Sequence, residues 1–167
     1  PSQILSTPTI TNVSCYGLSD GSASVSISGG IPTYAEDWGT NNPLSLSAGT
    51  YNYSITDGNS CIIYDSVTIT EPDSLFATSS VQNVSCYNYS DGVVDVNIQG
   101  GTTPYIITWD LVLSDSTYID SLVAGDYIYT ISDTNGCIFQ DTAFVSHPDE
   151  LIISDLITNV LCNGYHT

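Results

Sequence analysis

The sequence predicts an all-β protein built from tandem small immunoglobulin-like β-sandwich modules, and three observations support this fold class. The phrase NVSCYGLSDG, which begins at Asn12, recurs as NVSCYNYSDG at Asn83 and, in a shorter form, as NVLCNG at Asn159. Short runs alternate apolar and polar residues, as strands with one buried face do. No segment of a dozen residues sustains the 3.6-residue period of an amphipathic helix.

The repeat divides the chain into modules. Its first half recurs after 71 residues, so Cys15 aligns with Cys86, and its second half recurs after 76, so Cys61 aligns with Cys137. The second copy therefore holds an insertion of 76 − 71 = 5 residues, which is typical of a surface loop. We expect a segment of a longer array. The expected divisions are a first β-sandwich repeat at 1–73, a second at 74–149, and the first strand of a truncated third repeat at 150–167.

The alternating runs predict the strands of each module. SASVSIS places Ala23, Val25 and Ile27 on one face, and VVDVNIQ repeats this pattern from Val93. TYNYSIT and DYIYTIS alternate in the same way. Gly-Gly, Asp-Gly and Asn-Gly pairs separate these runs, and such pairs favour turns. Six or seven short strands in each copy are what a small sandwich requires.

Two aromatic positions recur in both copies. Trp38 and Trp109 lie in the middle of their modules, where a sandwich strand often carries a core tryptophan. LSAGTY and LVAGDY end on Tyr51 and Tyr127, and they resemble the corner at which a tyrosine hydroxyl bonds back to the backbone. We interpret these side chains as core and corner residues.

The charge balance excludes several kinds of partner. The chain has 18 acidic residues and no Lys or Arg. Binding to nucleic acid is excluded because no cations are present to neutralise phosphate, and attraction to anionic lipid is excluded for the same reason. No run approaches the roughly 18 apolar residues of a membrane span, so we expect no direct membrane insertion.

The order of motifs resembles the SprB-type repeat of large Bacteroidetes surface adhesins. Each copy has a cysteine, an Asp-Gly pair, an alternating strand, Gly-Gly followed by Tyr and Trp, Leu-x-Ala-Gly-x-Tyr, Asp-x-Asn-x-Cys and a closing Pro. The resemblance covers nearly the whole chain. Thr33 and Ser60 depart from the pattern, in which Pro and Gly are usual. The resemblance implies an extracellular, cell-surface protein that is exported by type IX secretion and serves adhesion or gliding motility.

The expected function follows from the repeats and the resemblance. We expect a structural, adhesive repeat segment of a long extracellular adhesin or filament that supports surface attachment or gliding through many weak contacts. Its expected partners are neighbouring repeats of the same chain and an unknown surface or glycan ligand. Two alternatives stay open: a carbohydrate-binding module of a secreted protein, and a filament or surface-layer subunit that assembles by strand exchange. No Ser-His-Asp arrangement recurs, so we predict no enzymatic activity.

The cysteines allow two disulfide patterns. The preferred pattern lies within modules and joins Cys15 to Cys61 and Cys86 to Cys137. The alternative crosses the module boundary and joins Cys61 to Cys86 and Cys137 to Cys162. Both patterns suit an oxidising compartment, and the spacing does not decide between them.

Two further kinds of site are expected. Asp-Ser or Asp-Thr followed by a small or aliphatic residue is a bacterial O-glycosylation pattern in this surface-protein setting. Turn carboxylates and amides could also contribute oxygen ligands to calcium, whereas no other cofactor is expected. The candidate glycosylation sites are Ser66, Ser74, Ser116, Ser121 and Thr142. The candidate calcium ligands are Asp20, Asp57, Asn59, Asp91, Asp133 and Asn135.

Overall fold

The computed structural model describes residues 2–155, and within that range the chain forms eleven β-strands and no helix. The all-β prediction is confirmed. The described residues contain no helix that could cross a membrane. The strands are β1 (Leu5–Thr11), β2 (Ser22–Ser28), β3 (Ala35–Asp37), β4 (Gly49–Thr56), β5 (Ile62–Ile69), β6 (Phe76–Gln82), β7 (Gly92–Gln99), β8 (Ile106–Trp109), β9 (Tyr118–Leu122), β10 (Gly125–Ser132) and β11 (Ile138–Val145).

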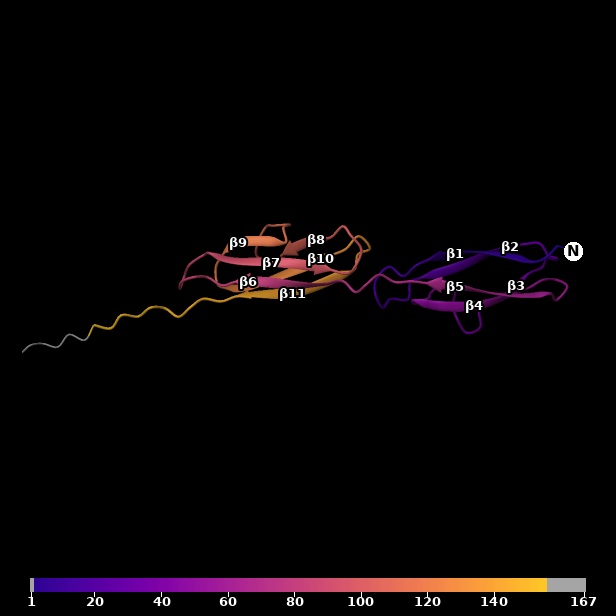
Figure 1. Cartoon of the computed structure of the whole chain (residues 1–167), viewed down its shortest axis with the longest axis horizontal. Helices are drawn as coiled ribbons and strands as arrows, with labels where there is room; N and C mark the ends of the chain where they lie inside the picture. Colours follow the sequence, from indigo (N-terminus) through magenta and orange to yellow (C-terminus); the bar gives the residue numbers. More distant parts are fainter. Residues whose placement is uncertain (1, 156–167) are drawn as a thin grey trace, which may run out of the picture.

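The strands form two bodies that lie end to end (Figure 1). Strands β1–β5 belong to residues 1–73, here called the first module, and β6–β11 belong to residues 74–149, the second module. Each module has its own core of buried apolar side chains. Residues 150–155 contain no strand, and the rest of the expected third repeat lies outside the described residues.

The second module is a sandwich of two antiparallel sheets with three strands each. One sheet has the order β6-β7-β9 and the other has the order β11-β10-β8. The β-sandwich prediction is confirmed, but its immunoglobulin-like part is not. The module has six strands, whereas an immunoglobulin constant domain has seven, arranged as four and three.

The first module has the same plan with a smaller first sheet. Strand β1 pairs with β2 alone, while β3, β4 and β5 form the second sheet. Where the second module pairs Gly92 with Leu122 on β9, the first module has only a single bridge between Gly21 and Leu46. The five extra residues between Trp109 and Leu122 therefore do more than lengthen a loop, because the longer segment forms a third strand where the shorter one forms only a bridge.

Side chains alternate between buried and more exposed positions along the strands, as the sequence predicts. On β10, Tyr127, Tyr129 and Ile131 are buried and the residues between them are partly exposed. On β4, Tyr53 and Ile55 are buried in the equivalent way. Burying such side chains stabilises each module by roughly 1.5–3 kcal/mol per large apolar side chain.

The recurring aromatic residues hold core and corner positions, as predicted. Trp38 stacks on Tyr53, with 4.5 Å between ring centroids, and Trp109 packs on Tyr129. Both tryptophans are buried. At the corners, the Tyr51 hydroxyl donates to the Ser47 carbonyl at 3.0 Å, and the Tyr127 hydroxyl donates to the Val123 carbonyl at 2.9 Å.

The Asn-Val pair of the recurring phrase closes one edge of each module. In the first module, the Asn12 side-chain oxygen accepts from the Thr70 amide at 3.0 Å, and the Val13 amide donates to the Thr70 carbonyl at 3.0 Å. Asn83 and Val84 bond the Ser146 backbone in the same way. The loop after the first strand is thereby fixed beside the end of the last strand.

The glycine of the Asp-Gly pair is required by close packing. A Cβ atom on Gly92 would lie 2.8 Å from Cγ1 of Val145 and 3.0 Å from the carbonyl oxygen of Leu122. No side chain fits between β9 and β11 at this point. In contrast, a Cβ atom on Gly125 would meet nothing within 4 Å.

We therefore predict that Gly92→Ala lowers the free energy of unfolding of the second module by about 1–3 kcal/mol, because it overpacks the core. Gly125→Ala is the matched control, and it should change the free energy of unfolding by less than about 0.5 kcal/mol. Urea unfolding followed by tryptophan fluorescence measures both values. Equal losses in the two variants would contradict the packing argument.

Candidate functional site at the joint between modules

A disulfide bond between Cys15 and Cys137 connects the two modules. Their Cα atoms lie 5.7 Å apart, within the usual range for a disulfide, although the two residues are 122 positions apart in the sequence. Cys15 lies in the loop between β1 and β2, and Cys137 lies in the turn between β10 and β11. The turn of the second module therefore faces the loop of the first.

This bond corrects the expected cysteine pairing. The structure forms neither Cys15–Cys61 nor Cys61–Cys86, and Cys61 and Cys86 are exposed free thiols. Cys137 is bonded to Cys15, so it is paired with neither Cys86 nor Cys162, and Cys162 itself lies outside the described residues.

The geometry of a single module explains why the intramodule bond does not form. Cys61 precedes β5, an eight-residue strand that spans about 26 Å. The far end of that strand, at Thr70, is hydrogen-bonded to Val13, two residues before Cys15. Cys15 and Cys61 thus lie at opposite ends of the same module, and a disulfide cannot bridge that distance.

The joint between the modules consists of residues 14–18 of the first module and residues 74–75 and 135–138 of the second. Other contacts accompany the disulfide there. The Asn135 side-chain nitrogen donates to the Ser14 carbonyl at 2.9 Å and to the Thr102 hydroxyl at 3.2 Å. A shallow groove runs between the two modules, and it is lined by Cys15, Tyr16, Leu18, Ser74, Leu75, Gly136, Cys137 and Ile138.

The linker between the modules is held on both sides. The Gly17 amide donates to a carboxylate oxygen of Glu71 at 2.7 Å, which fixes the start of the linker to the first module. The Gly101 amide donates to the Asp73 carbonyl at 2.9 Å, which fixes the end of the linker to the second module. Neighbouring Gly100 has φ of 69° and is packed against Ser74, where a Cβ atom would lie 1.9 Å from the carbonyl oxygen.

Two buried carboxylates hold the turns that carry Cys61 and Cys137. One oxygen of Asp133 accepts from the amides of Asn135 and Cys137, both at 2.9 Å. Its other oxygen accepts from the Thr102 amide at 2.8 Å. These contacts tie the turn that carries Cys137 to the loop that follows Gly101.

The first module repeats this arrangement around Asp57. Its carboxylate accepts from the amides of Asn59, Cys61 and Ile31 at 2.9–3.0 Å. The backbone amides of Cys61 and Ile31 stabilise the ionised form and hold the pKa of Asp57 below its usual value of 3.8.

The remaining candidate calcium ligands also lie in turns. The Ser14 hydroxyl and amide donate to Asp20 and lower the pKa of its carboxyl, and the Ser85 amide donates to Asp91 at 2.9 Å. The described residues contain no group of three or more His, Cys, Asp or Glu that could hold a metal ion. The structure thus gives these carboxylates partners within the backbone, and calcium binding stays a prediction.

The candidate glycosylation sites share one property, which is exposure to solvent. Ser66 and Thr142 occupy equivalent positions on β5 and β11, and the amide of each donates to the preceding aspartate at 2.8 Å. Glycosylation also stays a prediction. The exposed candidates are Ser66, Ser74, Ser116, Ser121 and Thr142.

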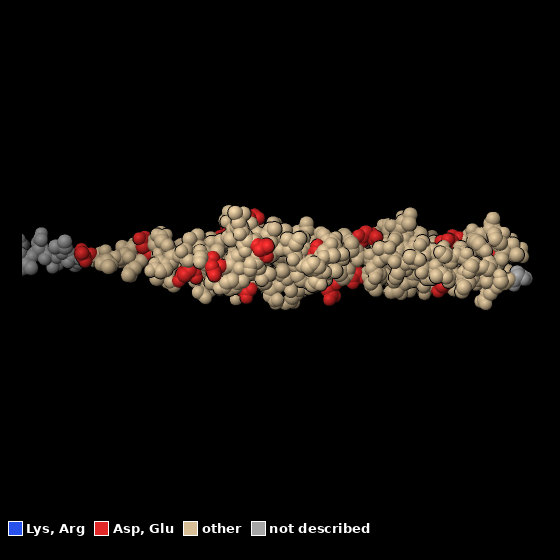
Figure 2. Space-filling model, turned by 90° about the horizontal axis from the view of Figure 1, so that it is seen from above, with Lys and Arg blue, Asp and Glu red and all other residues tan. Residues whose placement is uncertain are grey.

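Acidic side chains are spread along both modules on the face seen in Figure 2. They do not gather into a single patch on that face, and no basic side chain lies among them because the chain has none. Such a surface favours solubility and repels other anionic surfaces.

Comparison with known families supports the resemblance found in the sequence. The model of the SprB repeat matches residues 7–41 and 78–111. Each matched segment runs from the first strand of a module to just beyond its core tryptophan, so it includes Cys15 or Cys86 but neither Cys61 nor Cys137. No curated protein and no solved structure matches the chain.

The disulfide assignment predicts a specific peptide map. Alkylation without reduction, followed by digestion at acidic residues, should give a linked peptide that contains Cys15 and Cys137 and alkylated peptides that contain Cys61 and Cys86. Trypsin is unsuitable because the chain has no Lys or Arg. A peptide that links Cys15 to Cys61 would contradict the structure.

The low pKa of Asp57 predicts acid sensitivity. A lowered folded-state pKa stabilises the fold above about pH 4, and this contribution is lost as the pH falls through the folded-state value. Asp57→Asn should lower the melting temperature at pH 7, because the amide nitrogen cannot accept a hydrogen bond from a backbone amide. It should also weaken the dependence of melting temperature on pH between about 5 and 2.

Asp126→Asn is the control for charge, because Asp126 is exposed and its side chain accepts no hydrogen bond from any of residues 2–155. Melting temperatures followed by circular dichroism across this pH range measure both variants. If Asp57→Asn and Asp126→Asn showed the same pH dependence, the carboxylate would not hold the turn.

Proposed function

We propose that this chain, which carries two SprB repeats, is a force-transmitting repeat segment of a long extracellular adhesin or filament that supports surface attachment or gliding. SprB repeats are structural repeats of extracellular cell-surface proteins of Bacteroidetes. The family thus supports a surface repeat with a structural role, and the contribution to attachment or gliding is our proposal.

The covalent bond across the joint is the observation that carries this proposal. A pull on the two chain ends passes from β1 to Cys15, crosses the disulfide to Cys137 and leaves along β11. The residues between the two cysteines lie outside this covalent path. A segment built in this way transmits tension along a covalent path that bypasses β2–β10.

The end-to-end arrangement fits the same role. The modules extend along one axis, and the N-terminus lies at the end opposite the one where the described chain leaves the second module (Figure 1). Repeating this unit lengthens the molecule and multiplies its weak surface contacts, which raises avidity without strengthening any single contact. The ligand would be a surface or a glycan.

The two alternative functions find less support. An exposed tryptophan platform would favour a carbohydrate-binding module, but Trp38 and Trp109 are both buried in the cores. The strand proposed for exchange with a neighbouring subunit falls at 150–167, and most of that segment lies outside the described residues. We therefore retain the adhesin segment as the proposed function.

The force path predicts how far the chain extends when pulled by its ends. In single-molecule force spectroscopy, the oxidised chain should extend about 400 Å less than the reduced chain. The 122 positions between Cys15 and Cys137 are bypassed in the oxidised chain, at about 3.3–3.6 Å each.

Cys15→Ser should remove this difference, whereas Cys61→Ser should preserve it, because Cys61 is a free thiol outside the joint. Equal extension of the oxidised and reduced wild-type chains would contradict a force path through the disulfide.

A further inference from the structure

We propose that Cys61 and Cys86 are docking sites for further repeats, each forming a disulfide with a flanking module of the kind seen between Cys15 and Cys137. The partner at Cys61 would be the cysteine loop of a preceding repeat. The partner at Cys86 would be the Asp-x-Asn-x-Cys turn of a following repeat. This inference rests on the proposed function, because it requires a longer array of repeats.

The alignment of the repeats supplies the first argument. Cys86 is the copy of Cys15 at the offset of 71, and Cys61 is the copy of Cys137 at the offset of 76. The observed bond therefore joins the first-half cysteine of one module to the second-half cysteine of the next. Applied along an array, this pattern leaves one unused cysteine at each outer end of a two-module segment, and these are the two free thiols found within residues 2–155.

The surroundings of the free thiols supply the second argument. At the joint, Ser14, Cys15 and Cys137 are partly buried by the opposing module. Their copies Ser85, Cys86 and Cys61 are exposed. These residues are thus partly buried where a neighbouring module is docked and exposed where none is.

The groove beside Cys61 identifies the occupant. It has a volume of about 400 Å³, and its walls include Gln3, Ile4, Cys61 and Ile62. The copies of these four residues are Ser74, Leu75, Cys137 and Ile138, and all four line the groove at the joint.

At the joint, the opposite wall of that groove is formed by Cys15, Tyr16 and Leu18 of the first module. The groove beside Cys61 lacks this wall. Its walls come from the first module alone and include Asn59, the copy of the Asn135 that bonds the Ser14 carbonyl across the joint. A preceding Cys-Tyr-x-Leu loop, or its Cys-Tyr-x-Tyr equivalent, has the chemistry to complete it.

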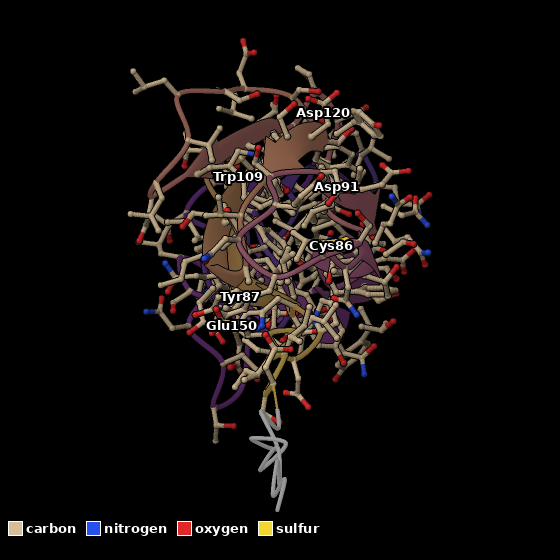
Figure 3. The ribbon with its side chains drawn as sticks, turned by 90° about the vertical axis from the view of Figure 1, so that its left-hand side faces the viewer. Cys86, Tyr87, Asp91, Trp109, Asp120 and Glu150 are labelled. Carbon is tan, nitrogen blue, oxygen red and sulfur yellow. A yellow bond between two sulfur atoms is a disulfide. The ribbon has the colours of Figure 1, made fainter. Side chains whose placement is uncertain are left out.

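The other outer end offers the complementary surface. Figure 3 looks onto the far end of the second module, where Cys86, Tyr87 and Asp91 lie on the end face near the point where the chain continues towards residue 155. Tyr87 packs edge-on against His147, with 5.1 Å between ring centroids. The Ser85 amide bonds Asp91, as the Ser14 amide bonds Asp20 at the joint. The loop that carries Cys86 thus has the same amide-to-aspartate hydrogen bond as the Cys15 loop, although no repeat is docked against it.

Bond formation requires an oxidant, and a small-molecule disulfide such as oxidised glutathione suffices. The two cysteine thiols lose two protons and two electrons and form one sulfur–sulfur bond. The glutathione disulfide accepts the two protons and the two electrons and is reduced to two glutathione thiols. An oxidising extracellular compartment supplies such disulfides.

The test uses the full chain with one added module. A second copy of residues 1–71 is placed directly before Pro1, which recreates the Glu71–Pro72 connection of the natural joint. The added copy carries Thr7→Ser, which changes the mass of the peptide that contains its Cys15, and Cys61→Ser, so that only the original chain supplies Cys61. After refolding in a glutathione redox buffer, peptide mapping should show a new bond between Cys15 of the added module and Cys61 of the original chain. The original Cys15–Cys137 bond should also be present, and it reports correct folding in the same molecule.

The first matched control is the unextended chain, in which Cys61 should be alkylated. The second is the extended chain with Cys61→Ser in the original module, in which Cys15 of the added module should be alkylated. A second extension tests the other end. Residues 92–149 placed after Thr167 complete the third repeat, and Cys86 should then bond the added copy of Cys137.

The inference is overturned if Cys15–Cys137 forms in the extended chain while Cys61 stays free or bonds Cys86. That result would leave the proposed force-transmitting role intact, because the role depends on the Cys15–Cys137 bond. Absence of the Cys15–Cys137 bond from the unextended chain would instead overturn the proposed function.

Discussion

Hydrogen bonds from backbone amides to carboxylates hold the turns on which the joint depends. Asp133 fixes the turn that carries Cys137, and Asp20 fixes the loop that carries Cys15. With no Lys or Arg in the chain, the described hydrogen bonds to its carboxylates come from amides, hydroxyls and an indole. The acidic composition is therefore used in local architecture as well as on the surface.

Much of the fold could be predicted because its signals are local. Alternation on β4 and β10 identified the buried faces, and the Leu-x-Ala-Gly-x-Tyr runs identified the tyrosine corners. The third strand supplied by the insertion could not be predicted, because its formation depends on pairing with β7 across the sheet. The buried role of Asp57 and Asp133 was also missed, since an Asp in a turn motif carries no sign of burial.

The disulfide was mispredicted for a reason that lies in the repeat itself. Aligning copies compares Cys15 with Cys86, but it does not show at which end of a module each one lies. The strand directions determine it. Strands β1 and β5 run the same way, so a cysteine after β1 and one before β5 must lie at opposite ends. The SprB repeat match does not help either, because it ends before Cys61 and Cys137.

The bond between Cys15 and Cys137 also changes what a protease can achieve. A single cut anywhere in the backbone between these residues leaves both fragments joined through sulfur, so the segment keeps its continuity from end to end. If successive joints are bonded in the same way, the closed loops overlap, and one cut within the array would fall inside at least one of them. A surface protein exposed to foreign hydrolases would then survive nicks that sever an ordinary string of domains.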